Sequence, residues 1–314
     1  MNLPTKLKPN DEVILIAPAR KVELESLLMA ENLLLKWRLK PLRSKNILAD
    51  AGIFAGDKEK RITDLQLAID HPTANAIWCY RGGYGSIQLL EGLNPASFLL
   101  NPKWIIGFSD ITNIHCFSNI ILNTASIHAT MPINIGLNTP KSLESLKEFL
   151  FKKEINYKIN SSSQNIPGEV KGAIVGGNLS VLCANLVTNY QPDFENKILF
   201  IEDIDEYFYK IDRMLWQLKF AGVFHQINGL IIGHFTNTKD NSTAFGMDLE
   251  EIVLQKLNEF DFPVVFNFPS GHENENLTLP LGLPLKLKVN SRFCLLYTSP
   301  SPRDRTRSRM PSSA

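Results

Sequence analysis

The chain has 314 residues, of which 44% are hydrophobic and 21% are charged, and its formal net charge is +1. This length predicts about two domains with a full hydrophobic core. The near-zero charge argues against a nucleic-acid-binding protein, the apolar content argues against a disordered chain, and no apolar run is long enough for a transmembrane helix. Because residues 1–10 also lack an apolar signal core, we expect a soluble, cytoplasmic protein.

Strand and helix patterns alternate along the first half of the chain. Apolar runs that end in a turn, as buried parallel strands do, are found over residues 12–17, 76–80 and 104–108. Helical patterns alternate with them over residues 23–39, 57–70 and 111–122. This alternation predicts a parallel sheet covered by helices on both faces, with ligands beyond the carboxyl ends of its strands.

The second half has elements of its own after a looser segment. A short helix is expected over residues 142–151, a polar run follows, and we place a linker at 151–167. Beyond the linker, strand patterns lie at residues 172–178, 198–201, 229–232 and 264–267, and helical patterns at residues 209–220 and 248–258. We therefore predict an N-terminal α/β domain over residues 1–150 and a smaller mixed α/β domain over 168–293.

The C-terminal segment from Cys294 differs from the rest of the chain. It reads CLLYTSPSPRDRTRSRMPSSA, is rich in Ser, Pro and Arg, and shows no helix or strand period. It is either a flexible basic tail or non-native coding sequence, and we favour the second and exclude residues 294–314 from the expected fold. The segment holds four arginines and one aspartate, which leaves 29 basic and 31 acidic residues, a net charge of −2, for the remainder.

Cysteines and metal-ligand patterns give little sign of a cofactor. The four cysteines include no CxxC pair, so we expect buried thiols in a reducing compartment. Cys116, which follows His115, is a weaker candidate nucleophile. The HExxH motif is absent, and no histidine lies within helical reach of the acids at 202–206, so we expect no metal and no cofactor. A flavin or nucleotide enzyme is a weaker alternative.

Ser109 is the first candidate for chemistry. It stands between an expected strand and an expected helix in the sequence Gly107–Ile111 (GFSDI). A serine at such a turn can form a nucleophile elbow, and the N–H of the next residue, Asp110, can stabilise an oxyanion at the helix N-terminus. The usual GxSxG pattern is only half present, however, and the alternative is that Ser109 and Asp110 merely cap the helix.

Three further segments also follow expected strands. The loop RGGYGS at 81–86 is either a simple turn or a loop that brings a second oxyanion N–H, since its glycines allow close backbone approach. Glu202 begins the acidic run EDIDE, which is a solvated turn or a source of an acid that orients a histidine. His272 lies in a polar loop, and His128 also has a loop-like context. Ser109, Glu202 and His272 thus occur in an order and in positions that allow a serine triad.

These motifs, in this order, resemble the LD-carboxypeptidase family of serine peptidases, the murein tetrapeptide carboxypeptidases. The resemblance runs along nearly the whole chain and rests on residues 81–86 (RGGYGS), 107–112 (GFSDIT), 176–179 (GGNL), 201–206 (IEDIDE), 211–218 (IDRMLWQL), 271–272 (GH) and 278–282 (TLPLG). It implies Ser109 as the nucleophile, Glu202 as the acid and His272 as the base. It also implies a flavodoxin-like N-terminal domain, a C-terminal domain of different topology, and a homodimer.

We expect a serine carboxypeptidase that releases the terminal D-alanine from murein tetrapeptides in peptidoglycan recycling. The oxyanion would be held by the N–H groups of Asp110 and Gly83, and the substrate would contact Arg81, Gly82 and Tyr84. Arg81 either binds the terminal carboxylate or is a buried structural arginine. The alternatives are a related serine hydrolase of the self-immunity type, which cleaves peptide–nucleotide antibiotics, and a non-catalytic ligand-binding protein. We expect no nucleic-acid or membrane partner.

Overall fold

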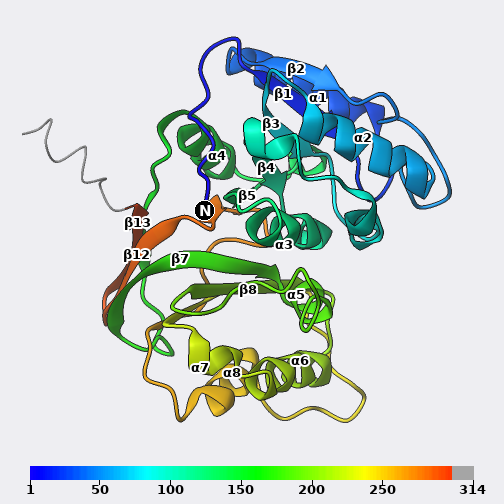
Figure 1. Ribbon diagram of the computed structural model, residues 1–314. Helices are drawn as coiled ribbons and strands as arrows, with labels where there is room; N and C mark the ends of the chain where they lie inside the picture. The colour runs from blue at the N-terminus through cyan, green and yellow to red at the C-terminus, as the bar shows by residue number, and fades with distance from the viewer. Residues whose placement is uncertain (299–314) are drawn as a thin grey trace, which may run out of the picture.

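The computed structural model describes residues 1–298, and residues 299–314 lie outside the described part of the chain. Thirteen strands of the described residues join into one sheet (Figure 1). The strands are β1 (Glu12–Ile16), β2 (Lys40–Arg43), β3 (Ala74–Cys79), β4 (Trp104–Gly107), β5 (Ser126–His128), β6 (Asn156–Asn160), β7 (Gly168–Asn178), β8 (Ile198–Ile204), β9 (Gly229–Thr236), β10 (Val264–Val265), β11 (Leu279–Leu281), β12 (Pro284–Val289) and β13 (Phe293–Thr298).

Helices connect most of these strands. The α-helices are α1 (Leu24–Lys36), α2 (Lys58–Asp70), α3 (Thr112–Ile120), α4 (Pro140–Lys152), α5 (Leu179–Ala184), α6 (Phe208–Phe220), α7 (Val223–Gln226) and α8 (Leu249–Leu257). Four short 3-10 helices are η1 (Ser86–Gly92), η2 (Phe98–Leu100), η3 (Ser109–Ile111) and η4 (Pro132–Asn134).

In the N-terminal half, β2, β1, β3, β4 and β5 lie side by side in that order and run parallel. Side chains of successive residues point to opposite faces of the sheet. Ile14 and Ile16 therefore join the core cluster formed with α2 and α3, whereas Val13 and Leu15 join the cluster formed with α1 and α4. The predicted parallel sheet with helices on both faces is confirmed.

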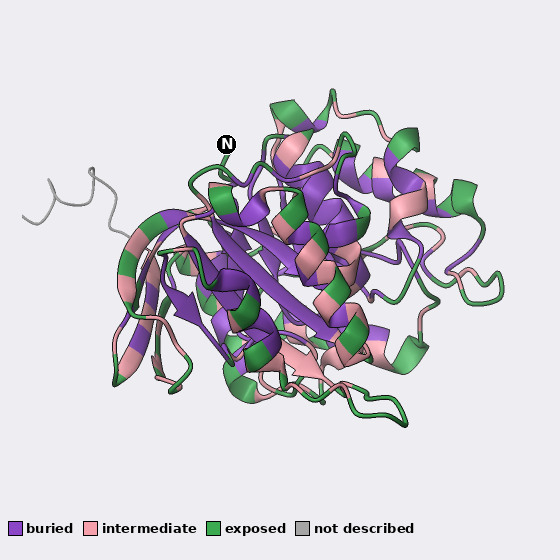
Figure 2. Cartoon of the chain, turned by 90° about the horizontal axis from the view of Figure 1, so that it is seen from below, coloured by how far each residue is buried: buried purple, intermediate pink, exposed green. Residues whose placement is uncertain are grey.

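In the C-terminal half, β7, β8, β9 and β10 form a second parallel block. Residues of α5, α6, α7 and α8 cover one face of this block. The other face, which includes Phe200 and Ile231, belongs to the same core cluster as Trp78 and Trp104 of the N-terminal half. Figure 2 shows this arrangement as buried strands at the centre and helices whose exposed faces point outward. The hydrophobic core is therefore continuous between the two halves.

Strand β11 connects the two blocks, because it pairs antiparallel with β5 and, through Leu281, parallel with β7. The ends of the blocks meet at the start of α3, where the backbone N–H of Asn178 donates to Thr112 Oγ1 at 3.0 Å. Gly177 has a φ of +141°, and a Cβ there would lie 2.6 Å from the same Oγ1, so only glycine allows this approach. Because Asn178 is paired with Glu202, the carboxyl end of β8 is brought toward α3.

The segment expected to be a linker, residues 151–167, contains a strand of the sheet. Strand β6 pairs antiparallel with β13, β13 with β12, and β12 with β7, which forms the antiparallel ribbon at the left of Figure 1. The pattern of β6 alternates between exposed and half-buried residues, so it lacks the apolar run that marks a buried strand. Its place in the sheet depends on a partner more than 130 residues away in the sequence.

The expectation that the fold ends at residue 293 is wrong, because residues 293–298 form β13. Cys294 and Leu296 are buried, whereas Phe293 and Leu295 are only partly buried, which is the alternation of a strand with one face on the core. This short alternation was hidden by the Ser-, Pro- and Arg-rich sequence that follows it. The rest of the expected non-native tail, residues 299–314, lies outside the described residues.

Replacing Leu296 with alanine should lower the free energy of unfolding by about 2–5 kcal/mol, because its side chain is fully buried in the core cluster. Urea-unfolding curves of the variant and the wild-type protein measure this loss. Leu295→Ala is the matched control, since Leu295 points to the other face and is partly exposed, and it should cost less. Equal stability of the Leu296→Ala and wild-type proteins would show that β13 does not contribute to the core.

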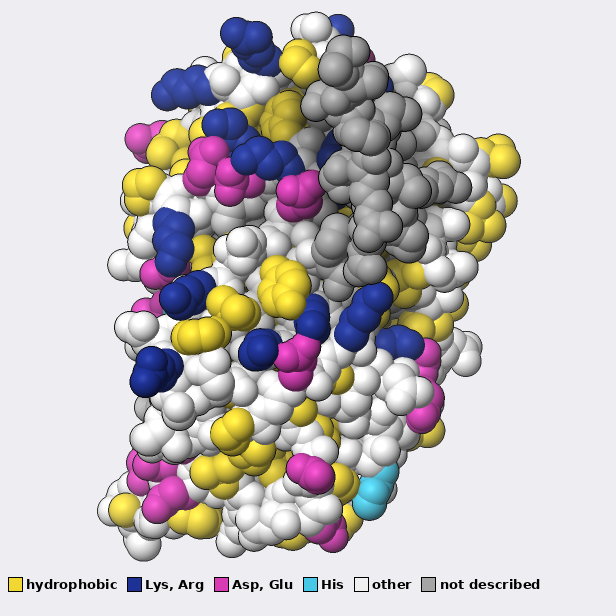
Figure 3. Space-filling model, turned by 90° about the vertical axis from the view of Figure 1, so that its left-hand side faces the viewer, with side chains coloured by type: hydrophobic (Ala, Val, Ile, Leu, Met, Phe, Trp, Pro, Cys, Tyr) yellow, Lys and Arg dark blue, Asp and Glu magenta, His cyan; other side chains and the backbone are white. Residues whose placement is uncertain are grey.

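The surface carries mixed charge. Figure 3 shows Lys and Arg side chains interspersed with Asp and Glu on one face. On the ribbon of antiparallel strands, for example, Glu169 of β7 contacts both Lys286 and Lys288 of β12. Within residues 1–298, no helix combines the length and the apolar character needed to cross a membrane.

Candidate active site

Ser109 lies directly after β4, in a sharp turn that leads into η3 and α3. Its φ is +63°, in the left-handed region that non-glycine residues rarely adopt. Gly107 at the end of β4 allows the turn to close, since a Cβ there would lie 2.9 Å from the side chain of Ile111. The turn therefore has the strained backbone of a nucleophile elbow, with only the first glycine of the usual motif needed.

The glycine loop that follows β3 packs directly against this turn. A Cβ on Gly82 would lie 3.1 Å from both Ser109 Cβ and the backbone N of Asp110, so a side chain at residue 82 would crowd the turn. Gly83 and Gly85 both have positive φ, of +106° and +127°. The expected close backbone approach of this loop is thus present, and the backbone of the loop lies beside the Asp110 N–H.

A buried polar network holds the loop to the turn. The Asp110 carboxylate accepts the backbone N–H of Ser86 at 2.9 Å, and the Ser86 hydroxyl donates to the Asp110 carbonyl at 2.6 Å. Asn113 of α3 donates to both residues, and Asn185 of the C-terminal half donates to Asn113 at 2.7 Å. Burial raises the pKa of Asp110, although the N–H groups of the loop oppose the shift. Sequence reasoning missed this role of the Asp110 side chain, for which the only signal was a polar residue at a helix start.

Glu202 and His272 form a hydrogen-bonded pair from two separate elements. Nδ1 of His272 lies 2.6 Å from Oε2 of Glu202, which is fully buried near the end of β8. A bulge in the pairing of β8 with β9 falls between Ile201 and Asp203 and so orients Glu202. Gly271 has a φ of +134°, and a Cβ there would lie 3.2 Å from the same oxygen, so the glycine lets the His272 loop approach the carboxylate.

The charges around His272 favour its protonated form. Burial lowers the pKa of His272, but the negative charge of Glu202 and its hydrogen bond, with smaller contributions from Asp203 and Asp205, outweigh burial and raise the pKa above its ordinary value. Burial and the adjacent charge of Glu202 raise the pKa of Asp203 to about 6. The Asp203 carboxylate accepts hydrogen bonds from Asn178, at 2.8 Å, and from the backbone of α5, so it ties β8 to the neighbouring strand and helix.

Phe108 connects the Glu202–His272 pair to the turn that holds Ser109. The His272 ring lies against Phe108, the residue before Ser109, in an edge-to-face contact with ring centroids 4.8 Å apart. His128 packs against the same Phe108 ring at 5.5 Å and against Phe200 of β8 at 4.9 Å. The structure thus brings His272 into contact with Glu202 and with Phe108, the residue that precedes Ser109.

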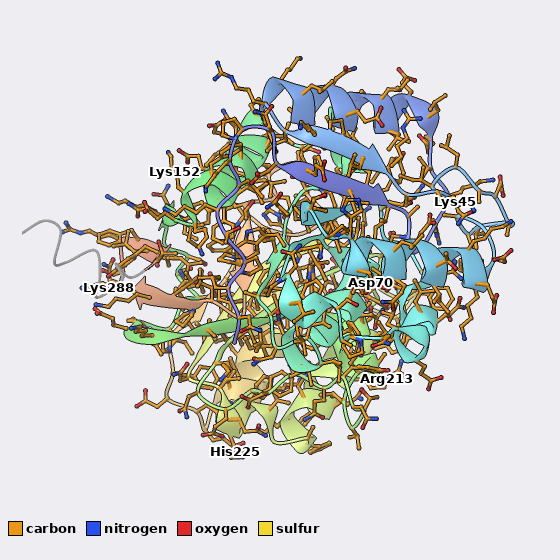
Figure 4. All side chains as sticks on the ribbon, turned by 45° about the horizontal axis from the view of Figure 1, so that its top comes forward. Lys45, Asp70, Lys152, Arg213, His225 and Lys288 are labelled. Atoms are coloured by element: carbon orange, nitrogen blue, oxygen red, sulfur yellow. The ribbon has the colours of Figure 1, made fainter. Side chains whose placement is uncertain are left out.

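Three other histidines lie in a strand or in helices. The loop-like context expected for His128 is wrong, because it is fully buried in β5, where burial lowers its pKa well below the ordinary value. His115 is buried in α3, with Nε2 2.9 Å from the Gly107 carbonyl. His225 is exposed on α7 at the outer edge of the C-terminal half (Figure 4).

Cys116 does not have the environment of a nucleophile. It is buried in α3, and burial raises the pKa of its thiol to about 12, so the thiolate is scarce at neutral pH. All four cysteines are free and buried. Among the described residues, no group of three or more His, Cys, Asp or Glu side chains is arranged to hold a metal ion.

Three charged or aromatic side chains surround the glycine loop. Arg81 is 27% exposed and its guanidinium lies 4.0 Å from Glu23, so it is neither free nor a deeply buried structural arginine. Tyr84 is about half exposed, with its ring 6.2 Å from that of Phe54. The side chain of Arg20 lies against Gly83. Sequence reasoning missed Arg20. Its position just after β1, at the edge of the sheet where the other candidates lie, is a signal that could have indicated it.

A hydrogen-bonded Glu–His pair and a serine in a sharp turn after a strand are features of serine hydrolases. Residues 13–129 match the family described as LD-carboxypeptidase N-terminal domain, and residues 171–287 match the family described as LD-carboxypeptidase C-terminal domain. A Bacillus subtilis (strain 168) protein named probable murein peptide carboxypeptidase is 31% identical over 274 residues, which cover 86% of this chain and 86% of that protein. The chain therefore belongs to the LD-carboxypeptidase family of serine peptidases.

Solved structures agree with this family. The crystal structure of muramoyltetrapeptide carboxypeptidase from Oxalobacter formigenes matches with a TM-score of 0.83 and 27% identity, over 92% of this chain and 99% of that chain. The microcin self-immunity protein MccF in complex with aspartyl sulfamoyl adenosine matches with a TM-score of 0.85 over 95% of this chain and 99% of that chain. Its identity of 21% shows a shared fold alone. The predicted family and fold class are thereby confirmed.

Proposed function

We propose that this protein is a serine carboxypeptidase that releases the terminal D-alanine of murein tetrapeptides, in the cytoplasm, as a step of peptidoglycan recycling. The observation that carries the proposal is the hydrogen bond between Glu202 and His272, whose ring contacts Phe108, the residue before Ser109 in its left-handed turn. The names of the relatives from Bacillus subtilis and Oxalobacter formigenes, which refer to murein peptide and muramoyltetrapeptide, support this class of substrate.

Ser109 is the proposed nucleophile and His272 the proposed general base. In the neutral tautomer whose Nδ1–H donates a hydrogen bond to Glu202, the Nε2 of His272 carries no proton. This nitrogen can therefore accept the proton of the Ser109 hydroxyl. The serine Oγ attacks the carbonyl carbon that joins the L-configured centre of a diamino acid to D-alanine, and the π electrons of that carbonyl move to its oxygen. Glu202 stabilises the imidazolium that forms on His272.

The negative oxygen of the tetrahedral intermediate needs donors at fixed positions. We assign this role to the backbone N–H groups of Asp110 and Gly83, and contacts with the rest of the substrate to Arg81, Gly82 and Tyr84. The close packing of Gly82 on the Asp110 N–H supports the assignment, because it sets the loop beside the helix start. The network through Ser86 holds the two segments in this relation.

The remaining steps return the enzyme to its starting state. The imidazolium of His272 gives its Nε2 proton to the D-alanine nitrogen as the C–N bond breaks, which leaves an ester between Ser109 and the tripeptide. Water then attacks the carbonyl carbon of this ester while His272 accepts a proton from the water. The bond to Ser109 Oγ breaks, and His272 gives the proton to this oxygen. The products are free D-alanine and a tripeptide with a new carboxylate.

The two halves of the chain divide these roles. We propose that the N-terminal half, residues 1–150, supplies Ser109, and that the C-terminal half, which continues through β13, supplies Glu202 and His272, with the active site between them. We also propose a homodimer, which the family resemblance supports. Light scattering of the purified protein tests the dimer, and a mass equal to that of one chain would exclude it.

The function is tested by incubating the purified protein with a murein tetrapeptide and, in parallel, with an aminoacyl sulfamoyl adenosine. The proposal predicts release of D-alanine and slow or no turnover of the nucleotide conjugate. Turnover of the nucleotide conjugate alone would favour the self-immunity type of hydrolase. Absence of turnover of both compounds, with a folded protein, would favour a non-catalytic ligand-binding protein.

A further inference from the structure

An enzyme that removes only the last residue of a peptide has to recognise the free terminal carboxylate. This need follows from the proposed function, and the inference drawn from it here rests on that function. A cation near the leaving residue is the usual means, because guanidinium and carboxylate groups form paired, charge-assisted hydrogen bonds. Two arginines lie at the glycine loop, Arg81 within it and Arg20 across it.

Arg81 already has a carboxylate partner. Its guanidinium lies 4.0 Å from Glu23, the residue before α1, and only 27% of its side chain is exposed. The backbone of Glu23 is fixed, since its N–H donates to the Tyr80 hydroxyl at 3.0 Å, whereas its side chain is 69% exposed. Binding of a substrate carboxylate by Arg81 would have to compete with this ion pair.

Arg20 is in a different position. It is exposed in the loop after β1, and a Cβ on Gly83 would lie only 2.6 Å from its Cδ and its Nε, so its stem lies directly on that glycine. Among residues 1–298, its guanidinium has neither a carboxylate partner nor a side-chain hydrogen bond. The adjacent Lys21, by contrast, points to Asp50, with Nζ 3.0 Å from the carboxylate.

Ser109 and Arg20 lie against two consecutive residues of the glycine loop. Gly82 packs on Ser109, and Gly83, the next residue, packs on Arg20. Consecutive Cα atoms are about 3.8 Å apart, and the carbonyl carbon under attack and the carboxylate carbon of a terminal residue are separated by roughly the same distance. An oxyanion held beside Gly83 would therefore place the carboxylate of the leaving D-alanine close to the guanidinium of Arg20.

We propose that Arg20 binds the terminal carboxylate of the peptide substrate and so restricts cleavage to the last residue. Gly83 has two roles in this arrangement, because its N–H faces the oxyanion and its missing side chain leaves room for the arginine stem. Arg81 pairs with Glu23 and contacts the substrate at a place other than its terminal carboxylate. The chemical class recognised is a peptide with a free C-terminal carboxylate, and a peptide amide should lack the interaction.

The test compares a murein tetrapeptide acid with its C-terminal amide, on the wild-type, Arg20→Gln and Arg20→Lys proteins. The wild-type protein should prefer the acid by about 10- to 100-fold in kcat/KM, the usual effect of one hydrogen-bonded charge. Arg20→Gln should lose about this factor on the acid, mostly through a higher KM, and should leave the rate on the amide nearly unchanged. Arg20→Lys should recover part of the preference.

Two matched variants complete the experiment. Lys21→Gln removes the neighbouring exposed cation, which pairs with Asp50, and should keep the wild-type preference. If Arg20→Gln keeps the preference for the acid, or slows the acid and the amide equally, the proposal for Arg20 is wrong. If Arg81→Gln abolishes the preference instead, Arg81 is the carboxylate-binding residue. If the wild-type protein releases neither D-alanine nor its amide, the proposed function fails, and this inference fails with it.

Discussion

Replacing Ser109 with alanine should lower kcat for D-alanine release by about 10⁵- to 10⁶-fold. The reason is that the hydroxyl oxygen is the only protein atom that forms a covalent bond with the substrate in the proposed mechanism. Adding His272→Ala to this variant should cause little further loss, because a base without its nucleophile has nothing to deprotonate. Initial rates of D-alanine release at saturating tetrapeptide measure both effects.

The Ser109→Ala protein should remain folded, since alanine keeps the Cβ and the left-handed φ of +63° carries a similar strain for both residues. Its thermal midpoint should therefore match that of the wild-type protein. Cys116→Ser is the matched control, because the buried thiol of Cys116 takes no part in the mechanism. Activity of Ser109→Ala within tenfold of the wild type, or inactivity of Cys116→Ser in a folded protein, would contradict the assignment of the nucleophile.

The second large effect is expected for Glu202→Gln. The substitution keeps the shape of the side chain but removes the charge that stabilises the His272 imidazolium and fixes its Nδ1 proton. Loss of the acid in other serine triads costs roughly 10⁴-fold in kcat, and we expect a loss of about this size here. Glu206→Gln is the matched control, because Glu206 lies in the same acidic run and pairs with Lys210 on the surface.

The pH dependence of kcat/KM gives a second measure of the same contact. The base acts in its neutral form, so kcat/KM should rise with pH as His272 loses its proton. Because Glu202 raises the pKa of His272, the midpoint for the wild-type protein should lie above the ordinary histidine value of about 6.5. In Glu202→Gln the pKa should fall, since burial then dominates, and the midpoint should move to lower pH. An unchanged midpoint would show that Glu202 does not act through His272.

Much of the fold could be predicted because buried parallel strands are continuous apolar runs. The strand at β1, for example, was expected over residues 12–17 and is found at Glu12–Ile16. Ser109, Glu202 and His272 could be proposed as site residues, because polar residues at or beyond the carboxyl ends of such runs lie at the edge of a sheet where ligands bind. The resemblance to a family then assigned their roles.

Other parts of the fold depend on contacts that a local pattern does not contain. Strand β2 (Lys40–Arg43) is a short edge strand with a proline. The helical pattern predicts a helix up to residue 39, directly before β2, whereas α1 ends at Lys36. Strands β6 and β13 pair with each other in the ribbon of antiparallel strands. Strand β6 has no apolar run, and the apolar residues 293–297 of β13 directly precede the Ser-, Pro- and Arg-rich sequence. Edge strands such as β2 and β6 are specified by their neighbours more than by their own sequence.

The same reason explains what was missed in the site. The role of Asp110 depends on the backbone of Ser86, 24 residues earlier, and the position of Arg20 depends on Gly83. The spacing of these residues in the sequence does not indicate either contact. By contrast, the glycines of the loop could be interpreted, since three glycines within four residues indicate close backbone approach even when the partner is unknown.

The central claim is that Ser109 makes this protein a carboxypeptidase of murein tetrapeptides. Mass spectrometry of a tetrapeptide incubated with equal amounts of wild-type or Ser109→Ala protein tests it most directly. The account predicts the masses of the tripeptide and of D-alanine with the wild-type protein, and the intact tetrapeptide with Ser109→Ala. Equal digestion by the two proteins, or cleavage of a different bond by the wild-type protein, would contradict it.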